Sequence, residues 1–400
     1  MKLDKRTAAV GLAVLAILGG LYLLMFRPVK VTREQNNQAR QTRRQARIQS
    51  RQQSSANAVC RRKSCEDIAS PNVTLTPPTS IFPQPPASQV KPELTGLLDR
   101  QGAPQPAYAG TAVRGFVVKV NWSDLQPTEN GPITSNNPID QAVAAARSVA
   151  ASHPGFGIKL RVYAGIYAPT WAKTLGGAPV TVTNPQTGKS ATIGRFWTDA
   201  YGDAYEDLQH KLAEKYDTVP EVREVVVSRC TTFFAEPFIR NKGSAETVSN
   251  LFDAGYNTAA DHTCHEKQLE SHQVWQHTRS DLELNPYQDI EQTGKASVDE
   301  SFTESMMQYC RAVLSIRCVL ENNSASDPPK YPRMYAVMKQ LGNPTSFQTA
   351  TSAKVGDLFN VLEWAVQQGA NAVELPQGYE SQPPDRYADF STRLAANPKA

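Results

Sequence analysis

The sequence lacks the motifs of several common enzyme classes. No glycine-rich phosphate loop of the GxGxxG or Walker type follows any predicted strand, so nucleotide chemistry is disfavoured. No Ser-His-Asp order and no HExxH motif is present, which disfavours serine hydrolase and zincin chemistry. His262, Cys264 and His265 lie close together, but they lack the four ligands and the spacing of structural zinc. The sequence therefore predicts no metal and no other cofactor, and a bond from Cys264 to Cys230 is a competing use of that thiol.

The chain also has little net charge of one sign. The formal charge is +4 over 400 residues, and the basic residues concentrate in the region up to Lys63. From Cys65 onward acidic residues outnumber basic ones. We therefore predict no nucleic-acid-binding core, but a basic segment attached to a mildly acidic domain.

The longest apolar run lies near the N-terminus. Residues Thr7 to Phe26 carry no charge, and about 20 such residues cross a bilayer as a helix. The run is followed by a poor cleavage site, so we predict an uncleaved single-span anchor after a short basic N-terminus, residues 1–6. Positive charge flanks the run on both sides and leaves its orientation open. The even number of cysteines suits an oxidising compartment, which favours a cell-membrane protein with an extracytoplasmic domain.

The cysteines allow two local pairs. Cys60 could bond to Cys65, and Cys310 to Cys318, with buried thiols as the alternative. Both halves of the segment 27–92 are poor in apolar residues. Arginine and glutamine dominate up to residue 55, and proline, serine and threonine dominate from residue 71. We interpret 27–92 as a disordered or extended linker, and 93–400 as the folded domain.

From Gly115 onward the sequence alternates short apolar runs with helical patterns. Strands are predicted at 116–120, 158–164, 222–227, 280–284, 313–320, 345–348 and 372–375, and helices at 140–151, 204–216, 245–254, 264–276, 301–310, 331–341 and 355–368. Turn residues predict a β-hairpin at 180–196. The strands read as apolar runs, which is typical of a parallel sheet covered on both faces. With an eighth strand before Gly115, the pattern predicts an α/β fold of the (β/α)8 TIM-barrel type.

The active site of such a barrel lies where the strands end. Carboxylates, amides, an arginine and aromatic residues dominate these positions, as a carbohydrate site requires. We predict substrate contacts from Asn121, Trp122, Tyr163, Trp171, Arg240, Asn285, Asn322, Gln348 and Tyr379, with Glu283 also near a strand end.

Two local motifs resemble clan A glycoside hydrolases, which include cellulase-like and β-galactosidase-like enzymes. The segment Val118 to Pro127, with Ile139-Asp140 after it, is similar to the region that follows their second barrel strand. Ala235-Glu236-Pro237 resembles their Asn-Glu-Pro signature at the end of the fourth strand. The resemblance covers roughly residues 115–379 and implies that Glu236 is the general acid/base. Ala235 departs from it, because the family has an asparagine there that contacts the sugar.

The second carboxylate of the pair is less well defined. The family places its nucleophile three strands after the acid, and that count leads to Gln348. If 280–284 is not a barrel strand, Glu374 moves into the nucleophile position. Otherwise Glu321 or Glu374 serves from a neighbouring strand, or the site is not hydrolytic. Glu374 is preferred, because it has the same strand-to-proline form as Glu236.

These observations predict a membrane-anchored glycoside hydrolase that acts on a β-linked saccharide by a retaining mechanism with paired glutamates. The alternative is a non-catalytic carbohydrate-binding barrel displayed on the cell surface. The predicted partners are a carbohydrate and, through Thr7 to Phe26, a membrane; the oligomeric state stays open.

Overall fold

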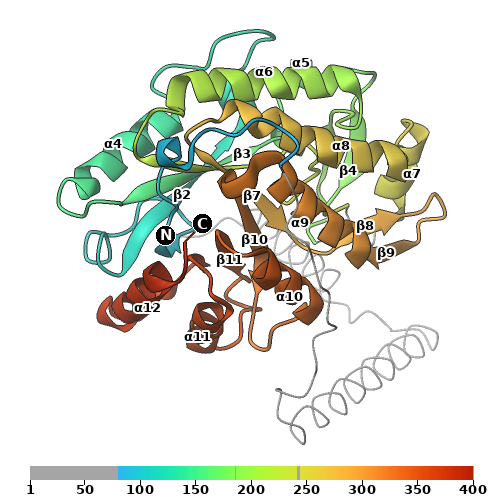
Figure 1. The fold of residues 1–400 in the computed structure, drawn as a ribbon. Helices are drawn as coiled ribbons and strands as arrows, with labels where there is room; N and C mark the ends of the chain where they lie inside the picture. The colour runs from blue at the N-terminus through green and yellow to red at the C-terminus, as the bar shows by residue number, and fades with distance from the viewer. Residues whose placement is uncertain (1–79, 185, 241–243, 400) are drawn as a thin grey trace, which may run out of the picture. The chain divides into compact units, whose positions relative to one another are not determined.

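The computed structural model describes residues 80–184, 186–240 and 244–399, which contain a closed barrel of eight parallel strands (Figure 1). The strands are β1 (Gly96–Asp99), β2 (Val113–Asn121), β3 (Gly157–Tyr163), β6 (Val222–Val226), β7 (Arg279–Leu284), β10 (Cys318–Ala325), β11 (Thr345–Thr349) and β12 (Ala372–Leu375). Neighbours in the chain are neighbours in the barrel, and β1 closes it by pairing with both β2 and β12. The predicted (β/α)8 TIM barrel is confirmed, including an eighth strand before Gly115.

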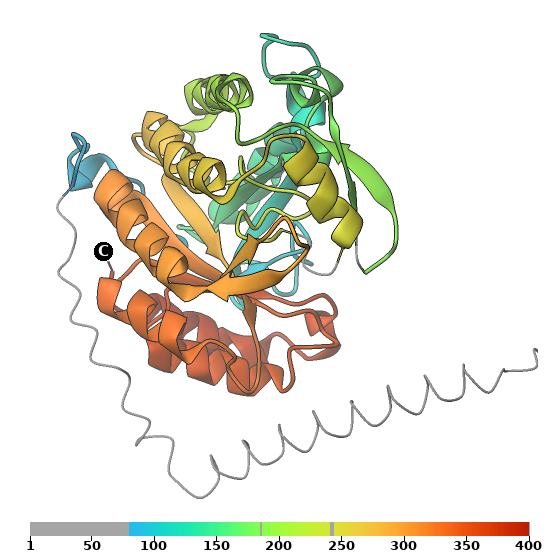
Figure 2. The ribbon, with the colours of Figure 1, turned by 90° about the vertical axis from the view of Figure 1, so that its right-hand side faces the viewer.

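Helices surround the strands (Figure 2). The main ones are α4 (Pro138–Ala150), α6 (Asp199–Tyr216), α8 (Thr258–Ser271), α9 (Glu300–Leu314), α10 (Pro332–Leu341), α11 (Leu358–Gln368) and α12 (Asp385–Ala396). Several begin at side chains that accept hydrogen bonds from the first backbone amides, such as Asn137 before α4 and Asp357 before α11. The predicted helices are all present, and α12 is an addition.

Shorter elements fill the connections. They are α3 (Trp122–Leu125), α5 (Thr170–Lys173), α7 (Ala245–Asp253), the 3-10 helices η2 (Ala87–Gln89), η3 (Gly165–Tyr167), η4 (His272–Val274), η5 (Ser315–Arg317) and η6 (Tyr379–Ser381), and the hairpin strands β4 (Val180–Thr183), β5 (Ser190–Ile193), β8 (Tyr287–Ile290) and β9 (Ala296–Asp299). The hairpin predicted at 180–196 is confirmed as β4–β5. A second hairpin, β8–β9, was not predicted.

One predicted strand is misplaced. The range 313–320 spans the end of α9, the turn η5 and the start of β10. Val313 and Leu314 are fully buried because they form the last turn of α9 against the core, not because they lie in a strand. The Cys310–Cys318 disulfide connects this helix to β10, so the predicted local pair is confirmed.

The character of the strands also differs from the prediction of uniformly apolar runs. In β3, Ile158, Leu160 and Val162 pack in an apolar cluster with the surrounding helices, while Lys159 and Arg161 alternate with them and form ion pairs inside the barrel. Because the side chains on both faces of β3 are buried, the burial pattern does not show this alternation of apolar and charged residues. The strands are not uniformly apolar, because charged side chains rather than apolar ones occupy the barrel interior.

The end of the predicted linker contacts the barrel. The amide of Ile81 donates to the carbonyl of Ala312 at 3.0 Å. The Lys91 ammonium donates to the carbonyls of Val219 and Val222, each at 2.7 Å, at the end of the barrel where β6 begins. Residues 80–92 therefore lie against the end of the barrel opposite the strand termini that carry the site.

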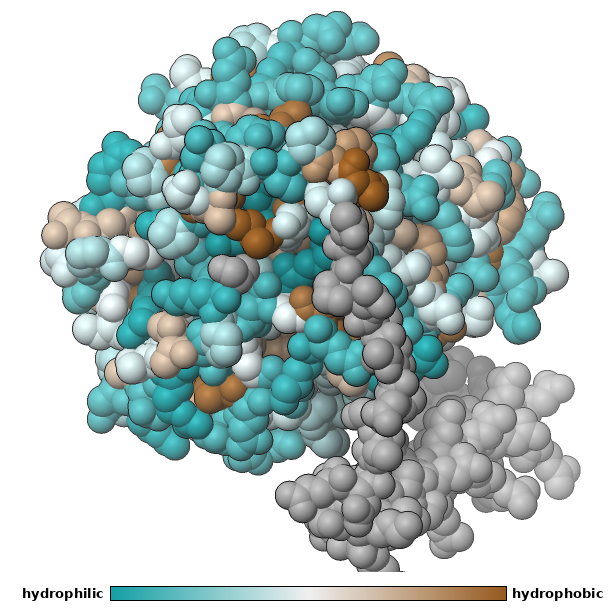
Figure 3. Space-filling view, viewed as in Figure 1, coloured by the Kyte–Doolittle hydropathy of each residue, from teal (hydrophilic) through white to brown (hydrophobic). Residues whose placement is uncertain are grey.

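The predicted membrane span at 7–26, and Cys60 and Cys65, lie outside the described residues. Among the described residues, no helix combines the length and the hydropathy needed to cross a bilayer. The molecular face in Figure 3 is mostly hydrophilic, and its hydrophobic residues form small scattered groups.

Candidate active site

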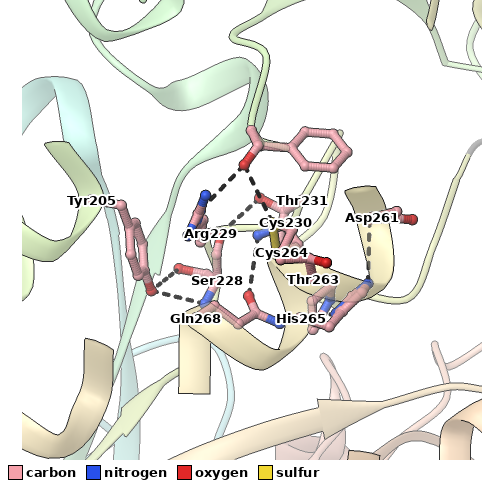
Figure 4. Close-up of a disulfide and its surroundings, with 12 residues drawn as sticks. Tyr205, Ser228, Arg229, Cys230, Thr231, Asp261, Thr263, Cys264, His265 and Gln268 are labelled. Atoms are coloured by element: carbon pink, nitrogen blue, oxygen red, sulfur yellow. Dashed lines mark hydrogen bonds and ion pairs between the residues drawn. A yellow bond between two sulfur atoms is a disulfide. The ribbon is translucent and has the colours of Figure 1, made fainter. Parts of the chain in front are cut away.

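A segment of loop after β6, residues 227–240, carries Glu236 and is attached to the scaffold at several points. The Cys230–Cys264 disulfide ties it to α8, so the competing use of Cys264 is confirmed. The amide of Cys230 donates to Gln268 Oε1 at 3.1 Å (Figure 4). The Ser228 hydroxyl donates to the carbonyl of Val162 at 2.5 Å. These contacts hold the start of the segment to α8 and β3.

Arg240 holds the other end of the segment. Its guanidinium forms two bonds to the Asp261 carboxylate, at 2.8 and 2.5 Å, and donates to the carbonyls of Cys230 and Pro237 at 3.0 and 2.5 Å. Arg240 is completely buried. The structure therefore places this predicted substrate contact behind the loop, where it fixes the position of Glu236.

Glu236 lies between two hollows at the barrel mouth. A pocket of about 170 Å³ is lined by Arg100, Lys119, Arg161, Tyr163, Phe234, Ala235, Glu236, Glu283 and Gln348. A groove of about 500 Å³ shares Phe234 and Glu236 with the pocket and extends past Asn285 and Asn323. A chain-like ligand can thus have one unit in the pocket and the next in the groove, with Glu236 at the junction.

Glu283 is the carboxylate that accompanies Glu236. Burial raises the pKa of Glu236 above its usual value, and the nearby Glu283 carboxylate raises it further. A hydrogen bond from the Asn323 side chain opposes these effects. The same Asn323 amide donates to Glu283 Oε2 at 2.8 Å, so it contacts both carboxylates. The pair therefore consists of one carboxyl with a raised pKa and one carboxylate that accepts hydrogen bonds from Arg161 and Asn323.

Beneath this pair, Lys159 occupies the centre of the barrel. Its ammonium lies 2.5 Å from Glu321, 2.6 Å from Asp281, 3.1 Å from Glu374 and 3.4 Å from Glu224. All five side chains are buried. Burial alone would lower the pKa of Lys159, but the surrounding carboxylates raise it well above its usual value, so it stays charged.

Arg161 connects this interior cluster to the pocket. Its Nε atom donates to Glu283 at 2.5 Å, and its Nη2 atom lies 2.8 Å from Glu374 and 3.4 Å from Glu321. Burial would raise the pKa of Glu374, but Arg161 and Lys159 lower it to about 2. Burial, reinforced by Asp281 and Glu374, raises the pKa of Glu321 well above its usual value.

Three acids of the cluster have the spacing of a cation site. Ligand oxygens of Asp281, Glu283 and Glu321 lie within 4.8 Å of one another. The Lys159 ammonium contacts two of these acids, and the Arg161 guanidinium contacts the third. Protein cations therefore already neutralise the position at which a metal would bind.

The two candidate nucleophiles lie in this interior cluster. Residues 280–284 belong to barrel strand β7, so Glu374 is on the eighth strand and Gln348 ends the seventh. Glu374 and Glu321 are fully buried and do not line the pocket, whereas Gln348 does.

The structure gathers only part of the predicted substrate-binding set. Tyr163 and Gln348 line the pocket with Glu236, and Asn285 lines the groove. Trp122 is completely buried, with its indole nitrogen donating to Gln126, and the half-buried Trp171 packs against it with ring centroids 5.6 Å apart.

The remaining predicted contacts have structural partners outside the pocket. Asn121 donates to Asp124 at 2.9 Å, and the buried Asn322 donates to the carbonyl of Leu284 at 2.9 Å. Tyr379 is buried and donates to Asp99 at 2.8 Å. Each of these side chains stabilises a strand end or a turn at the mouth.

Several residues of the pocket were not predicted: Arg100, Lys119, Arg161 and Phe234, together with Asn323 beside it. A signal was available for Arg161, because it alternates with apolar residues in β3. The alternation placed it on the inner face of a strand whose other face packs against helices. Arg100 follows a strand of only four residues, which gave no periodic signal.

No protein-family model matches the chain, and no curated protein sequence matches it. One similar solved structure is the catalytic domain of β-amylase from Paenibacillus polymyxa, with 11% identity over 78% of this chain and 100% of the other and a TM-score of 0.46. A second is β-mannanase from the blue mussel Mytilus edulis, with 9% identity over 76% of this chain and 92% of the other and a TM-score of 0.42. A third is morphinone reductase in complex with tetrahydroNAD, with 14% identity over 77% of this chain and 92% of the other and a TM-score of 0.41. The set contains both glycosidases and an oxidoreductase. At these scores the likeness carries no argument about activity, and the barrel itself is defined by its strand pairing.

Proposed function

We propose that this chain is a glycoside hydrolase that cleaves a β-linked oligo- or polysaccharide with retention of configuration. Glu236 is the general acid/base, and Glu283 is the nucleophile in place of Glu374 or Glu321. One observation carries the proposal: a glutamate with a raised pKa lines a pocket at the barrel mouth beside a second, ion-paired glutamate. Glycosidases of this type need one carboxyl that donates a proton and a second, charged carboxylate that attacks the anomeric carbon.

The chemistry follows from the two environments. Glu236 gives its proton to the glycosidic oxygen as the bond from that oxygen to the anomeric carbon breaks. Glu283 attacks the same carbon and forms a glycosyl ester. Glu236, now ionised, takes a proton from water, the resulting hydroxide displaces Glu283 from the anomeric carbon, and both glutamates return to their starting states. Retention requires carboxyl groups about 5 Å apart, and their shared contact with Asn323 supports a short separation.

The proposal is tested with Glu236→Gln and Glu283→Ala and a panel of aryl β-glycosides. Each change should lower kcat by about 10²- to 10⁴-fold, since each removes a group that acts in the transition state. Azide should restore turnover in Glu283→Ala and give a glycosyl azide of inverted configuration, because the small anion enters the space of the lost nucleophile.

Undiminished activity in Glu236→Gln would overturn the assignment of the acid. Azide rescue of Glu374→Ala, but not of Glu283→Ala, would instead return the nucleophile to Glu374. Circular dichroism of each variant checks that the fold is intact.

A carbohydrate-binding barrel without catalysis is the second candidate. It is favoured by Gln348 at the end of β11, where a carboxylate would be needed, and by the full burial of Glu283. Binding of an oligosaccharide by calorimetry, with equal affinity in wild type and Glu236→Gln and no reducing ends formed, would support this candidate over hydrolysis.

For either function we propose that residues 7–26 anchor the barrel to the cell membrane. Fractionation tests this directly: the full chain should sediment with membranes and be released by detergent but not by high salt. Release by salt alone would contradict a spanning helix.

A further inference from the structure

Two cations of the pocket form no ion pair within the part of the chain that the structure describes. Arg161 is committed to Glu283, Glu374 and Glu321. By contrast, Arg100 and Lys119 form no ion pair with any described residue. Among the described residues, the Arg100 guanidinium makes one hydrogen bond, from Nη1 to the carbonyl of Thr349 at 2.6 Å, and its other N–H groups have no partner there. The pocket thus presents two cations that form no ion pair with a described acid.

These cations lie on adjacent strands and face the glutamates. Arg100 directly follows β1, and Lys119 lies in β2, which pairs with β1 at Asp99 and Phe116. Glu236 follows β6 and Glu283 lies in β7, on the opposite side of the strand order. A ligand in the pocket therefore has carboxylates on one side and cations on the other.

The cost of this arrangement indicates an anionic ligand. Burial lowers the pKa of Arg100, and Glu374 opposes this in part. For Lys119, which stays partly exposed, desolvation together with Arg161 and Arg100 lowers the pKa, and Glu374 and Asp99 oppose this in part. Both shifts mean that each cation is less stable in its charged form here than in water. An anion between them would remove the mutual repulsion and accept the unused guanidinium donors.

We propose that the sugar unit in this pocket carries one carboxylate, as in a hexuronic acid, and that Arg100 and Lys119 bind it. This inference rests on the proposed function for the identity of the ligand as a saccharide. The pocket of about 170 Å³ is below the roughly 300–1,000 Å³ of drug-sized sites, so it suits a single ring.

The number and type of charges favour a carboxylate over other anions. The planar fork of arginine matches the two oxygens of a carboxylate. The Glu283 carboxylate lines the pocket and repels a doubly charged phosphate more than a singly charged group. Sulfate shares the single charge, and the experiment separates it from carboxylate.

Calorimetric titration of the full chain tests the inference without turnover. The probes are glucuronate, galacturonate, glucose, galactose, glucose 6-sulfate and glucose 6-phosphate. We expect at least one uronate to bind about tenfold or more tightly than its neutral counterpart, and this preference to weaken as salt is raised. Arg100→Gln and Lys119→Gln should each reduce the ratio toward one. Lys189→Gln, an exposed lysine between β4 and β5, is the matched control and should keep it.

Any other result of the titration contradicts the inference. Equal binding of uronates and neutral sugars, or no binding of any probe, removes the anionic subsite. Tighter binding of the 6-sulfate or 6-phosphate reassigns it to another anion. Turnover of aryl β-glycosides is measured in parallel. Uronate preference without turnover would end the hydrolase proposal alone, and turnover of neutral glycosides without uronate preference would end this inference alone.

Discussion

The interior of the barrel and the pocket at its mouth both hold carboxylates and cations, but in opposite proportion. Inside, Lys159 and Arg161 face an excess of acids, namely Glu224, Asp281, Glu283, Glu321 and Glu374. At the mouth, the three cations Arg100, Lys119 and Arg161 outnumber the two acids Glu236 and Glu283. In the interior, the raised pKa values of Asp281 and Glu321 reduce the excess negative charge. At the mouth, Arg100 and Lys119 remain available to a ligand. A glutamate near a strand end can therefore stabilise the fold or take part in chemistry, and its role depends on the charged groups that surround it.

Substitution of Lys159, at the centre of the barrel, should cause the largest loss of stability and so tests the difference between interior and mouth. Lys159→Met would leave Asp281, Glu321 and Glu374 without their shared cation, and removal of one partner from a buried ion pair costs about 3–5 kcal/mol. Lys119→Met is the matched control at the mouth, where the exposed lysine has no ion pair with described residues, and should change stability by about 0.5 kcal/mol or less. Urea denaturation gives both values. Equal losses of unfolding free energy in the two variants would contradict the proposed difference between the interior and the mouth.

The two glutamates of similar local sequence should respond differently to amide substitution. Glu374→Gln removes a charge that Lys159 and Arg161 both contact, so we expect a loss of about 1.5–3 kcal/mol. Glu236→Gln replaces a carboxyl whose pKa is raised by burial and that forms no ion pair with a described residue, and it should change the free energy of unfolding by about 0.5 kcal/mol or less. Thermal and chemical unfolding measure this. A destabilised Glu236→Gln with an unaffected Glu374→Gln would reverse the roles.

Stability should depend on pH through Asp281. Burial raises the pKa of Asp281 to about 8 in spite of Lys159, whereas in the unfolded chain it is about 3.9. Between these values the native state holds a proton that the unfolded state has released, so the free energy of unfolding falls as pH rises toward 8.

Asp281→Asn should remove this contribution, because the amide is neutral at every pH. We expect the variant to lose less stability than wild type between pH 5 and pH 8. Parallel curves for the two proteins would show that the interior does not retain a proton at this position.

The smallest expected effect concerns Asn323, which contacts both glutamates at the junction of pocket and groove. Its hydrogen bond lowers the pKa of Glu236, so Asn323→Ala should raise that pKa. As a general acid, Glu236 must be protonated, and activity falls as pH rises through its pKa. The alkaline limb of kcat/KM should therefore move to higher pH, by less than about one unit. A shift to lower pH would contradict the role of Asn323.

The barrel could be predicted because its outer face obeys simple rules. Strands such as 222–227 and 372–375 end at turn residues, and helices with one apolar face separate them. The interior was harder to predict. Lys159 in β3 and Asp281 in β7 alternate with apolar residues, yet their partners come from distant strands, and no local pattern specifies such pairings.

The same limit applies to the candidate site. Glu236 was found because a short motif surrounds it, and Gln348 because it ends a strand. Arg100 follows a four-residue strand, and Asn323 lies one residue beyond the predicted Asn322. Which of two adjacent residues faces the mouth depends on the register of β10, a property of the assembled sheet.

The closure of the barrel has a consequence for biosynthesis. Gly96, at the start of β1, pairs with Ala372 in the last strand, and Arg100 bonds to Thr349 in β11. While the chain is on the ribosome, β1 has an unpaired edge until nearly all of the protein has been made, and such edges recruit other strands. Loop closure over this separation is also slow. A nascent chain that stops short of β12 therefore has one edge of β1 unpaired, and Lys159 and Arg161 lack their Glu374 partner.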